Sequence, residues 1–386
     1  MSINLDNNAT TRPAPEVIDA MTECLSEDWG NPSSAHRRGL SARRRVDLAR
    51  DSVAKLVGCR ANEIVFTSGG TEAGNLAVVG GFDRVRQSDP RRRIVIGPGT
   101  EHPAIGDAFA ECVRLGGEHV TLPVGNDGLL DIDVLEELLR ARGDECALLS
   151  VMWANNETGV IQPLDRIGRL CRDHGVLVHT DAVQWVGRMP CDFASLPVDL
   201  LSCSAHKFHG PKGVGALVVR SGVQVRPRAL GGAQERERRG GTENVPAIAG
   251  FGVACELADS WLSADRLESM SRLRDGFERL ILDSLPGVVV NGGGAPRLWN
   301  TSNLGFESTR AQFLVVVLSE RGVAASGGSA CASGSIEPSG VLLGMGLDPE
   351  TASSSLRFSM ARDTTDEELE RAVEIIVDAV RAARES

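Results

Sequence analysis

The chain has 386 residues, of which 42% are hydrophobic, and a formal net charge of -11 at pH 7. This length and composition argue against disorder, because such a chain can bury a large core or divide into two lobes. The acidic surplus argues against a protein that binds nucleic acid through phosphate contacts, since that binding requires an excess of Lys and Arg.

The N-terminal residues and the cysteines limit the class of protein further. The string MSINLDNNATT contains neither a basic leader nor an apolar signal-peptide core, and no later window has about 18 uninterrupted apolar residues. We therefore expect a cytoplasmic protein without membrane contact. The nine cysteines include no C-x-x-C pair, and their odd number disfavours a secreted disulfide framework, so neither disulfides nor a metal site are predicted.

Short β-branched runs alternate with helical segments through the first two-thirds of the chain. Six strands are predicted from EIVFT, RIVIG, ALLSVM, VLVHTD, DLLSCSA and GALVVR, which start at Glu63, Arg93, Ala147, Val176, Asp199 and Gly215. This alternation is typical of an α/β fold with a mostly parallel sheet and crossover helices.

The pattern changes at about Leu257. We expect one long amphipathic helix from there through Leu285, a short strand GVVV, a strand near Asn303 and a helix over RAQFLVVVLSERG. A last helix, DEELERAVEIIVDAVRAARE, is acidic at its start and basic near its end, as the helix dipole favours. We predict a large domain over residues 15–255 and a small α+β domain formed by residues 1–14 and 256–386.

A glycine turn in IVFTSGGTEAGNLAVVGG separates a predicted strand from a predicted helix. The backbone amides after Gly69 and Gly70 and the hydroxyl of Thr71 would point to one place, where an anion such as a phosphate could bind. The string matches neither a Walker loop nor the dinucleotide fingerprint, and an ordinary strand–helix turn is the alternative.

Lysine is rare in this sequence, which contains only Lys55, Lys207 and Lys212. Lys207 follows a predicted strand in SAHKFHGPKG, where burial would lower its pKa and free the amine for a Schiff base. A surface lysine in a loop is the commoner case. We interpret Lys212, in a glycine-flanked turn, and Lys55, on an apparent helix, as structural.

Three further residues are candidates for cofactor or substrate contacts. Asp181 ends an apolar strand in VLVHTDAVQ and could pair with a pyridinium nitrogen or cap a helix. His102 opens a helix in GTEHPAIGDAF and could stack on a flat ring or move protons, although a solvated histidine is the alternative. Arg357, in SSSLRFSMAR, could bind a carboxylate with its guanidinium.

Cys331 differs from the other cysteines in its surroundings. It stands in AASGGSACASGS, a run of small residues without helical or strand period, so we expect an exposed, mobile loop and a reactive thiol. Five cysteines in predicted helices or strands are expected to be inert small hydrophobes: Cys112, Cys146, Cys171, Cys203 and Cys255.

Together these strings resemble the NifS/IscS-type cysteine desulfurases, a branch of the class V aminotransferase-like enzymes with the fold-type I PLP-dependent transferase fold. The resemblance extends almost from end to end of the chain. The following strings occur in the same order as in that family: LDNNATT, GNPSSAH, IVFTSGGTE, EHPA, VMWANNETG, HTDAVQ, SAHKFHGPKG, QERERRGGTEN, GSACASGS and LRFS. The resemblance implies conversion of L-cysteine to L-alanine, with transfer of sulfur as a persulfide on Cys331 to an acceptor protein. Iron–sulfur cluster assembly is the expected use; selenocysteine lyase or another class V aminotransferase-like enzyme is the alternative.

By matching position, the resemblance also implies a residue set for pyridoxal 5'-phosphate (PLP). Lys207 would bind the cofactor covalently, Asp181 would pair with its ring nitrogen, His102 would stack on the ring, and Gln184 would contact the phenolic oxygen. The phosphate would be held in a homodimer by Gly70, Thr71, Ser204, His206 and Thr242 of the partner subunit. Substrate binding would fall to Arg357 and to Asn156, which also borders the cofactor.

Two positions depart from the family's usual pattern. Glu237 stands in QERERRGGT where glycine is usual, and Gly340 stands in EPSGVL where a histidine or aromatic residue is usual. Neither touches a role implied above, but both could alter loops or partner contacts.

Overall fold

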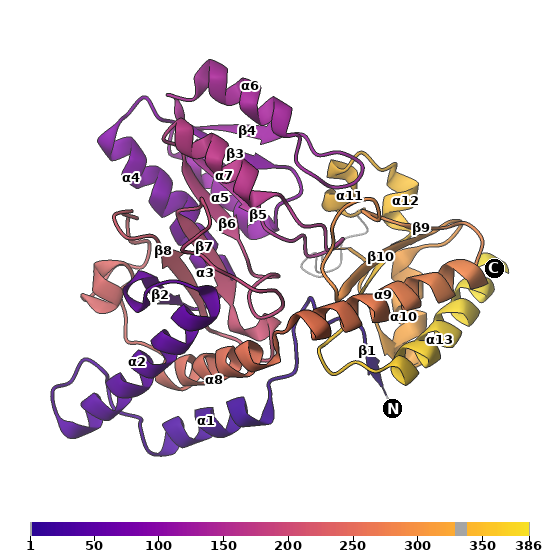
Figure 1. Cartoon of the computed structure of the whole chain (residues 1–386), viewed down its shortest axis with the longest axis horizontal. Coiled ribbons are helices and arrows are strands. Elements are labelled where there is room, and N and C mark those ends of the chain that lie inside the picture. Colours follow the sequence, from indigo (N-terminus) through magenta and orange to yellow (C-terminus); the bar gives the residue numbers. More distant parts are fainter. Residues whose placement is uncertain (1, 329–337, 386) are drawn as a thin grey trace.

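The structure is a computed structural model that describes residues 2–328 and 338–385. Within these ranges, the main sheet has seven strands in the order β2-β8-β7-β6-β5-β3-β4 (Figure 1). Their bounds are β2 Ile64–Thr67, β3 Ile94–Pro98, β4 Glu118–Leu122, β5 Cys146–Met152, β6 Leu177–Asp181, β7 Leu200–Ser204 and β8 Gly215–Val219. Only β8 runs antiparallel to its neighbours, β2 and β7. The predicted mostly parallel mixed sheet is confirmed, and β4 is an edge strand that the sequence pattern did not reveal.

Helices cover both faces of this sheet, so its strands are apolar on both sides. Ile94 and Ile96 of β3 belong to one core, and Val95 between them belongs to a second core on the opposite face. The first face is covered by α1 Pro15–Ser26, α2 Arg37–Val57, α6 Ile132–Arg142, α7 Leu164–Asp173 and α8 Val245–Trp261. The other is covered by α3 Gly70–Asn75, α4 Gly81–Ser88 and α5 Pro103–Arg114.

A smaller antiparallel sheet with the order β12-β10-β9 lies beside the main one (Figure 1). Its strands are β9 Val288–Val290, β10 Thr301–Phe306 and β12 Ser355–Ser359, and its helices are α9 Ala264–Ser284, α10 Ala311–Glu320, α11 Gly340–Gly344, α12 Pro349–Ser353 and α13 Asp366–Glu385. Ile3 and Leu5 are buried in its core with Phe306 and Phe358. The N-terminal arm also pairs β1 Ile3–Asn4 in parallel with β11 Val323–Ala324. The domain boundaries proposed from the sequence stay a prediction.

The prediction of a single helix from about Leu257 through Leu285 is wrong. α8 ends at Trp261 and α9 begins at Ala264, with a bend of 87° between them. Ser263 has an extended backbone, and its side chain accepts a hydrogen bond from the amide of Arg266, so it caps α9 and interrupts the helical pattern. Among the described helices, no single one is long and apolar enough to cross a membrane, although this bent pair meets both criteria together.

Candidate active site

Most of the residues selected from the sequence follow the carboxyl ends of the parallel strands. Asp181 ends β6 and Ser204 ends β7, and the short 3-10 turn Ala205–Lys207 follows directly. β2, β3 and β5 run in the same direction and lead to Gly70, His102 and Asn156. Because parallel strands end at the same edge of a sheet, the fold gathers these residues there, where α/β proteins commonly bind ligands.

The glycine turn after β2 packs closely against β7. A Cβ atom on Gly70 would lie 2.7 Å from Cγ2 of Val183 and 3.7 Å from Cβ of Ser204, so a larger residue does not fit without a shift. Thr71, the second residue of α3, is exposed. The buried hydroxyl of Ser204 has no hydrogen-bond partner within the described part of the chain. A buried polar atom of this kind marks a place where a ligand can supply the missing bond.

Asp181, His102 and Lys207 lie close enough to influence one another's protonation. Burial raises the pKa of Asp181, while the amide of Val183, at 2.9 Å from Oδ1, together with His102 and Lys207 lowers it. Burial lowers the pKa of His102, opposed by Asp181. His102 is the N-cap of α5, and its Nδ1 accepts a hydrogen bond from the amide of Ala104 at 3.1 Å. The imidazole is therefore neutral at pH 7, with its proton on Nε2.

The amine of Lys207 is directed to the N-terminal arm. Its Nζ donates to the carbonyl oxygens of Asn8 at 2.6 Å and Ala9 at 2.9 Å. The neighbouring His206 contacts the same arm, with Nδ1 3.1 Å from Oγ1 of Thr10. Burial lowers the pKa of His206 to about 4, assisted by the charge of Lys207. The arm therefore holds the turn that carries Lys207.

Gln184 is oriented by a buried arginine that the sequence analysis missed. Nη1 of Arg188 donates to Oε1 of Gln184, while Nε2 of Gln184 donates to the carbonyl of Asn8 at 3.1 Å. Burial lowers the pKa of Arg188 to about 9. Since an arginine has no acceptor, this contact fixes the Gln184 amide with its NH2 group away from Arg188.

Arg357 and Asn156, the two residues expected to bind the substrate, contact each other, and a third residue joins them. Arg357 is buried in β12, where Nη1 donates to the carbonyl of Asn156 at 3.1 Å and Nη2 donates to Oδ1 of Asp6 at 2.7 Å. The side-chain Oδ1 of Asn156 and Nε of Arg357 have no hydrogen-bond partner among residues 2–328 and 338–385. Asp6 and Asn8 belong to LDNNATT, which supported the resemblance but was given no role; its run of polar residues was the available signal.

Cys331 lies outside the described residues. The described residues on either side of that segment contact the substrate-side residues: Ser326 and Arg357 exchange backbone hydrogen bonds of 3.1 and 2.7 Å. The hydroxyl of Ser339 donates to Oε2 of Glu157 at 2.5 Å. Ser326 and Ser339 thus lie beside Arg357 and the Asn156–Glu157 turn, respectively.

Thr242 is exposed in the loop that precedes α8. This loop contains three consecutive residues in the left-handed region: Glu235, Arg236 and Glu237, with φ of 46°, 58° and 64°. The carboxylate of Glu235 fixes the loop to the main sheet by accepting from Arg50 at 2.7 and 2.8 Å and from the amide of Phe66 at 3.0 Å. The left-handed backbone at Glu237 is a conformation that glycine adopts with less strain than other residues.

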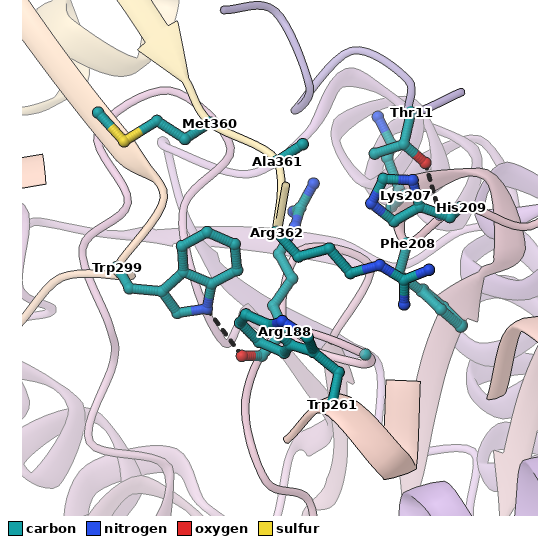
Figure 2. A pocket seen from close by; sticks show the side chains of 11 residues that line it. Thr11, Arg188, Lys207, Phe208, His209, Trp261, Trp299, Met360, Ala361 and Arg362 are labelled. Atoms are coloured by element: carbon teal, nitrogen blue, oxygen red, sulfur yellow. Dashed lines mark hydrogen bonds between the residues drawn. The ribbon is translucent and has the colours of Figure 1, made fainter. Parts of the chain in front are cut away.

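A cavity of about 20 Å³ is lined by residues that include Lys207, Thr11, His209, Trp261 and Trp299. Figure 2 shows these side chains. The indole Nε1 of Trp299 donates to the carbonyl of Arg188 at 2.9 Å, and the amide of His209 donates to Oγ1 of Thr11 at 2.6 Å. A space of this size holds about one water molecule, so it does not accommodate a cofactor ring.

The chain is similar to known proteins over nearly its whole length. Residues 3–372 match the family described as aminotransferase class-V. A cysteine desulfurase of Trichormus azollae is 42% identical over 382 residues, covering 99% of this chain and 94% of that protein. The cysteine desulfurase NifS of Azotobacter vinelandii is 42% identical over 386 residues, covering 99% and 93%.

Solved structures give the same result. A NifS-like protein superimposes with a TM-score of 0.89 at 34% identity, covering 99% of this chain and all of the other. DndA from Streptomyces lividans superimposes with a TM-score of 0.77 at 35% identity, covering 91% and 97%. The chain therefore belongs to the class-V aminotransferase family. Within that family it groups with the cysteine desulfurases of the NifS type, which confirms the resemblance.

Proposed function

We propose that this protein is a PLP-dependent cysteine desulfurase that converts L-cysteine to L-alanine and passes the sulfur to an acceptor. The observation that carries the proposal is the cluster of buried Asp181 with the half-buried His102 and Lys207 at the edge of the main sheet. Relatives named cysteine desulfurase support it, as does a protein 31% identical whose structure is described as SspA in complex with cysteine.

The residues fit PLP. The hydroxyl of Ser204, which has no partner among the described residues and lies beside the tightly packed Gly70, suits a phosphate. Thr71 and His206 would be further contacts, with Thr242 of the partner subunit in a homodimer. Asp181 suits a protonated ring nitrogen, because its own charge is otherwise compensated only in part by the neighbouring groups. His102 would cover the ring, and the Gln184 amide would donate to the ring oxygen. Lys207 would attach the cofactor through Nζ.

The chemistry that PLP supplies when bound is an electron sink for the bonds at the α-carbon of an attached amino acid. Arg357 and Asn156 bind and orient the substrate, and Nζ of Lys207 removes the α-proton. The thiolate of Cys331 attacks the sulfur of the substrate, so one S–S bond forms as one C–S bond breaks. L-Cysteine and the Cys331 thiol thus become L-alanine and a Cys331 persulfide, from which the acceptor takes the sulfur.

Covalent labelling tests the cofactor site. The purified protein is reconstituted with PLP, reduced with borohydride, digested and mapped by mass spectrometry. The label is expected on Lys207, because its turn adjoins Ser204 and the glycine turn. Lys55 is a matched control, since its Nζ pairs with Asp259 at 2.7 Å on the surface. Label on Lys55 or Lys212 would overturn the assignment.

A further inference from the structure

The ion pair between Arg357 and Asp6 occupies part of the proposed substrate site. Arg357 has 2% of its side chain exposed, and Asp6 has 26% exposed. Nη2 of Arg357 donates to Asp6, and Nη1 donates to the carbonyl oxygen of Asn156. Nε is the guanidinium nitrogen that has no acceptor among the described residues. The carboxylate of Asp6 therefore contacts the guanidinium through one oxygen and leaves a neighbouring donor unused.

The unused donor matters because of guanidinium geometry. Nε and Nη2 form one of the parallel N–H pairs with which arginine binds a carboxylate through two hydrogen bonds. Leaving one buried N–H of that pair without an acceptor costs free energy, which a second carboxylate oxygen at Nε would recover. A carboxylate that spans both donors would bind better than the single contact made by Asp6.

The backbone of Asp6 is held in place while its side chain reaches solvent. Asp6 forms a parallel bridge with Ser359, two residues beyond Arg357. The side chain of Asn7 donates to the carbonyl of Ser359 at 2.9 Å, and the amide of Asp6 donates to Oδ1 of Asn4 at 3.1 Å. Because the chain is anchored on both sides, the Asp6 carboxylate can leave Arg357 by rotating its side chain alone.

We propose that Asp6 occupies half of the substrate carboxylate site and competes with the α-carboxylate of the substrate for Nη2 of Arg357. This inference rests on the proposed function, which assigns Arg357 to the substrate carboxylate. Asp6 neutralises a buried cation in the substrate-free enzyme, where a lone charge would be costly. The substrate displaces it and takes Nε and Nη2 together. Asp6 thus weakens carboxylate binding and raises the KM for L-cysteine.

The test compares Asp6→Asn with the wild-type holoenzyme by calorimetric titration of 3-mercaptopropionate. Asn keeps an acceptor for Nη2 but removes the competing charge. We expect binding about fivefold tighter, with KM for L-cysteine lowered by a similar factor and kcat within about twofold. The neutral analogue 3-mercaptopropanamide should bind wild type and variant equally. Asp19→Asn, which removes an exposed charge on α1, is the matched control for net charge and should leave binding unchanged.

Arg357→Lys separates failure of this inference from failure of the proposed function. If Arg357→Lys leaves 3-mercaptopropionate binding unchanged, Arg357 is not the carboxylate site and the function assigned to it is wrong. If Arg357→Lys weakens binding and Asp6→Asn does not tighten it, only the role of Asp6 is wrong. Thermal unfolding of ligand-free Asp6→Asn shows whether the variant folds. Asp6→Ser, which also lacks the charge, should tighten binding of the same ligand if Asp6→Asn does not fold.

Discussion

The residues proposed to hold the cofactor and those proposed to hold the substrate carboxylate come from different kinds of structure. Asp181 ends strand β6, and Lys207 lies just after the adjacent parallel strand β7, whose register pairs Asp181 with Ser202. Arg357 comes from the small sheet and Asn156 from a turn after β5. Their neighbour Asp6, the proposed competitor of the substrate, comes from the N-terminal arm, and the Asp6–Arg357 contact spans 351 residues. The cofactor residues are positioned by one sheet, whereas the substrate residues depend on how distant segments pack.

The largest expected effect is the loss of sulfur transfer in a variant that still binds both the cofactor and the substrate carboxylate. Cys331→Ala removes the proposed nucleophile and leaves Lys207, Asp181 and Arg357 intact. We expect cofactor absorbance and 3-mercaptopropionate binding to be retained, while alanine formation from L-cysteine falls about 10³-fold or more. Alanine release by the purified variant is the measurement, with mass spectrometry for an added sulfur on the wild-type Cys331 peptide. Turnover near the wild-type rate, with no persulfide trapped, would show that Cys331 is not the nucleophile.

A smaller effect is expected from a serine that belongs to the cofactor residues. Ser204→Ala removes a buried hydroxyl that has no partner among the described residues, so the stability of the cofactor-free protein should barely change. PLP affinity should fall about tenfold, because the phosphate loses one hydrogen bond. Ser302→Ala is the matched control, since Ser302 has a similarly buried and unpartnered hydroxyl but lies in β10 of the small sheet.

PLP binding to both variants can be followed by fluorescence quenching. Equal PLP affinities of Ser204→Ala and Ser302→Ala would show that Ser204 does not contact the cofactor. They would also contradict the proposal that the main sheet, and not the small sheet, holds the phosphate.

A further expected effect, on stability instead of binding, is a pH dependence in the turn that carries Lys207. The pKa of His206 is lowered from 6.5 to about 4, mainly by burial, so the unfolded chain binds a proton before the folded protein does. The free energy of unfolding should therefore decrease as pH falls from about 6.5 to 4, and His206 should contribute no further loss below that. His206→Gln should give a shallower decrease over this window in urea unfolding curves of the cofactor-free protein. An unchanged slope would mean that His206 is protonated equally in both states.

The same contrast explains how much the sequence could predict. Asp181 and Lys207 could be singled out from the sequence because a strand and the turn after it are local patterns, and the sheet then brings the strand ends together, whereas Ser204 was implied only by the family resemblance. Asp6, Asn8 and Arg188 were missed, since their roles come from contacts with residues far along the chain. The edge strand β4 was missed because its half-exposed residues lack the continuous apolar run of the central strands. The bend at Ser263 depended on one capping side chain.

The N-terminal arm is synthesised first, but its full set of contacts can form only after the C-terminal part of the chain has been synthesised. Asn8 donates to the carbonyl of Asn156 at 3.1 Å and to Oγ1 of Thr301 at 2.9 Å, and its own carbonyl receives Nζ of Lys207. Its amide also donates to Oγ of Ser359 at 2.9 Å. Residues 3–11 are made before all of these partners, yet they reach their final position only after residue 359 has left the ribosome. A nascent chain therefore carries the complete main sheet before it carries a complete catalytic centre.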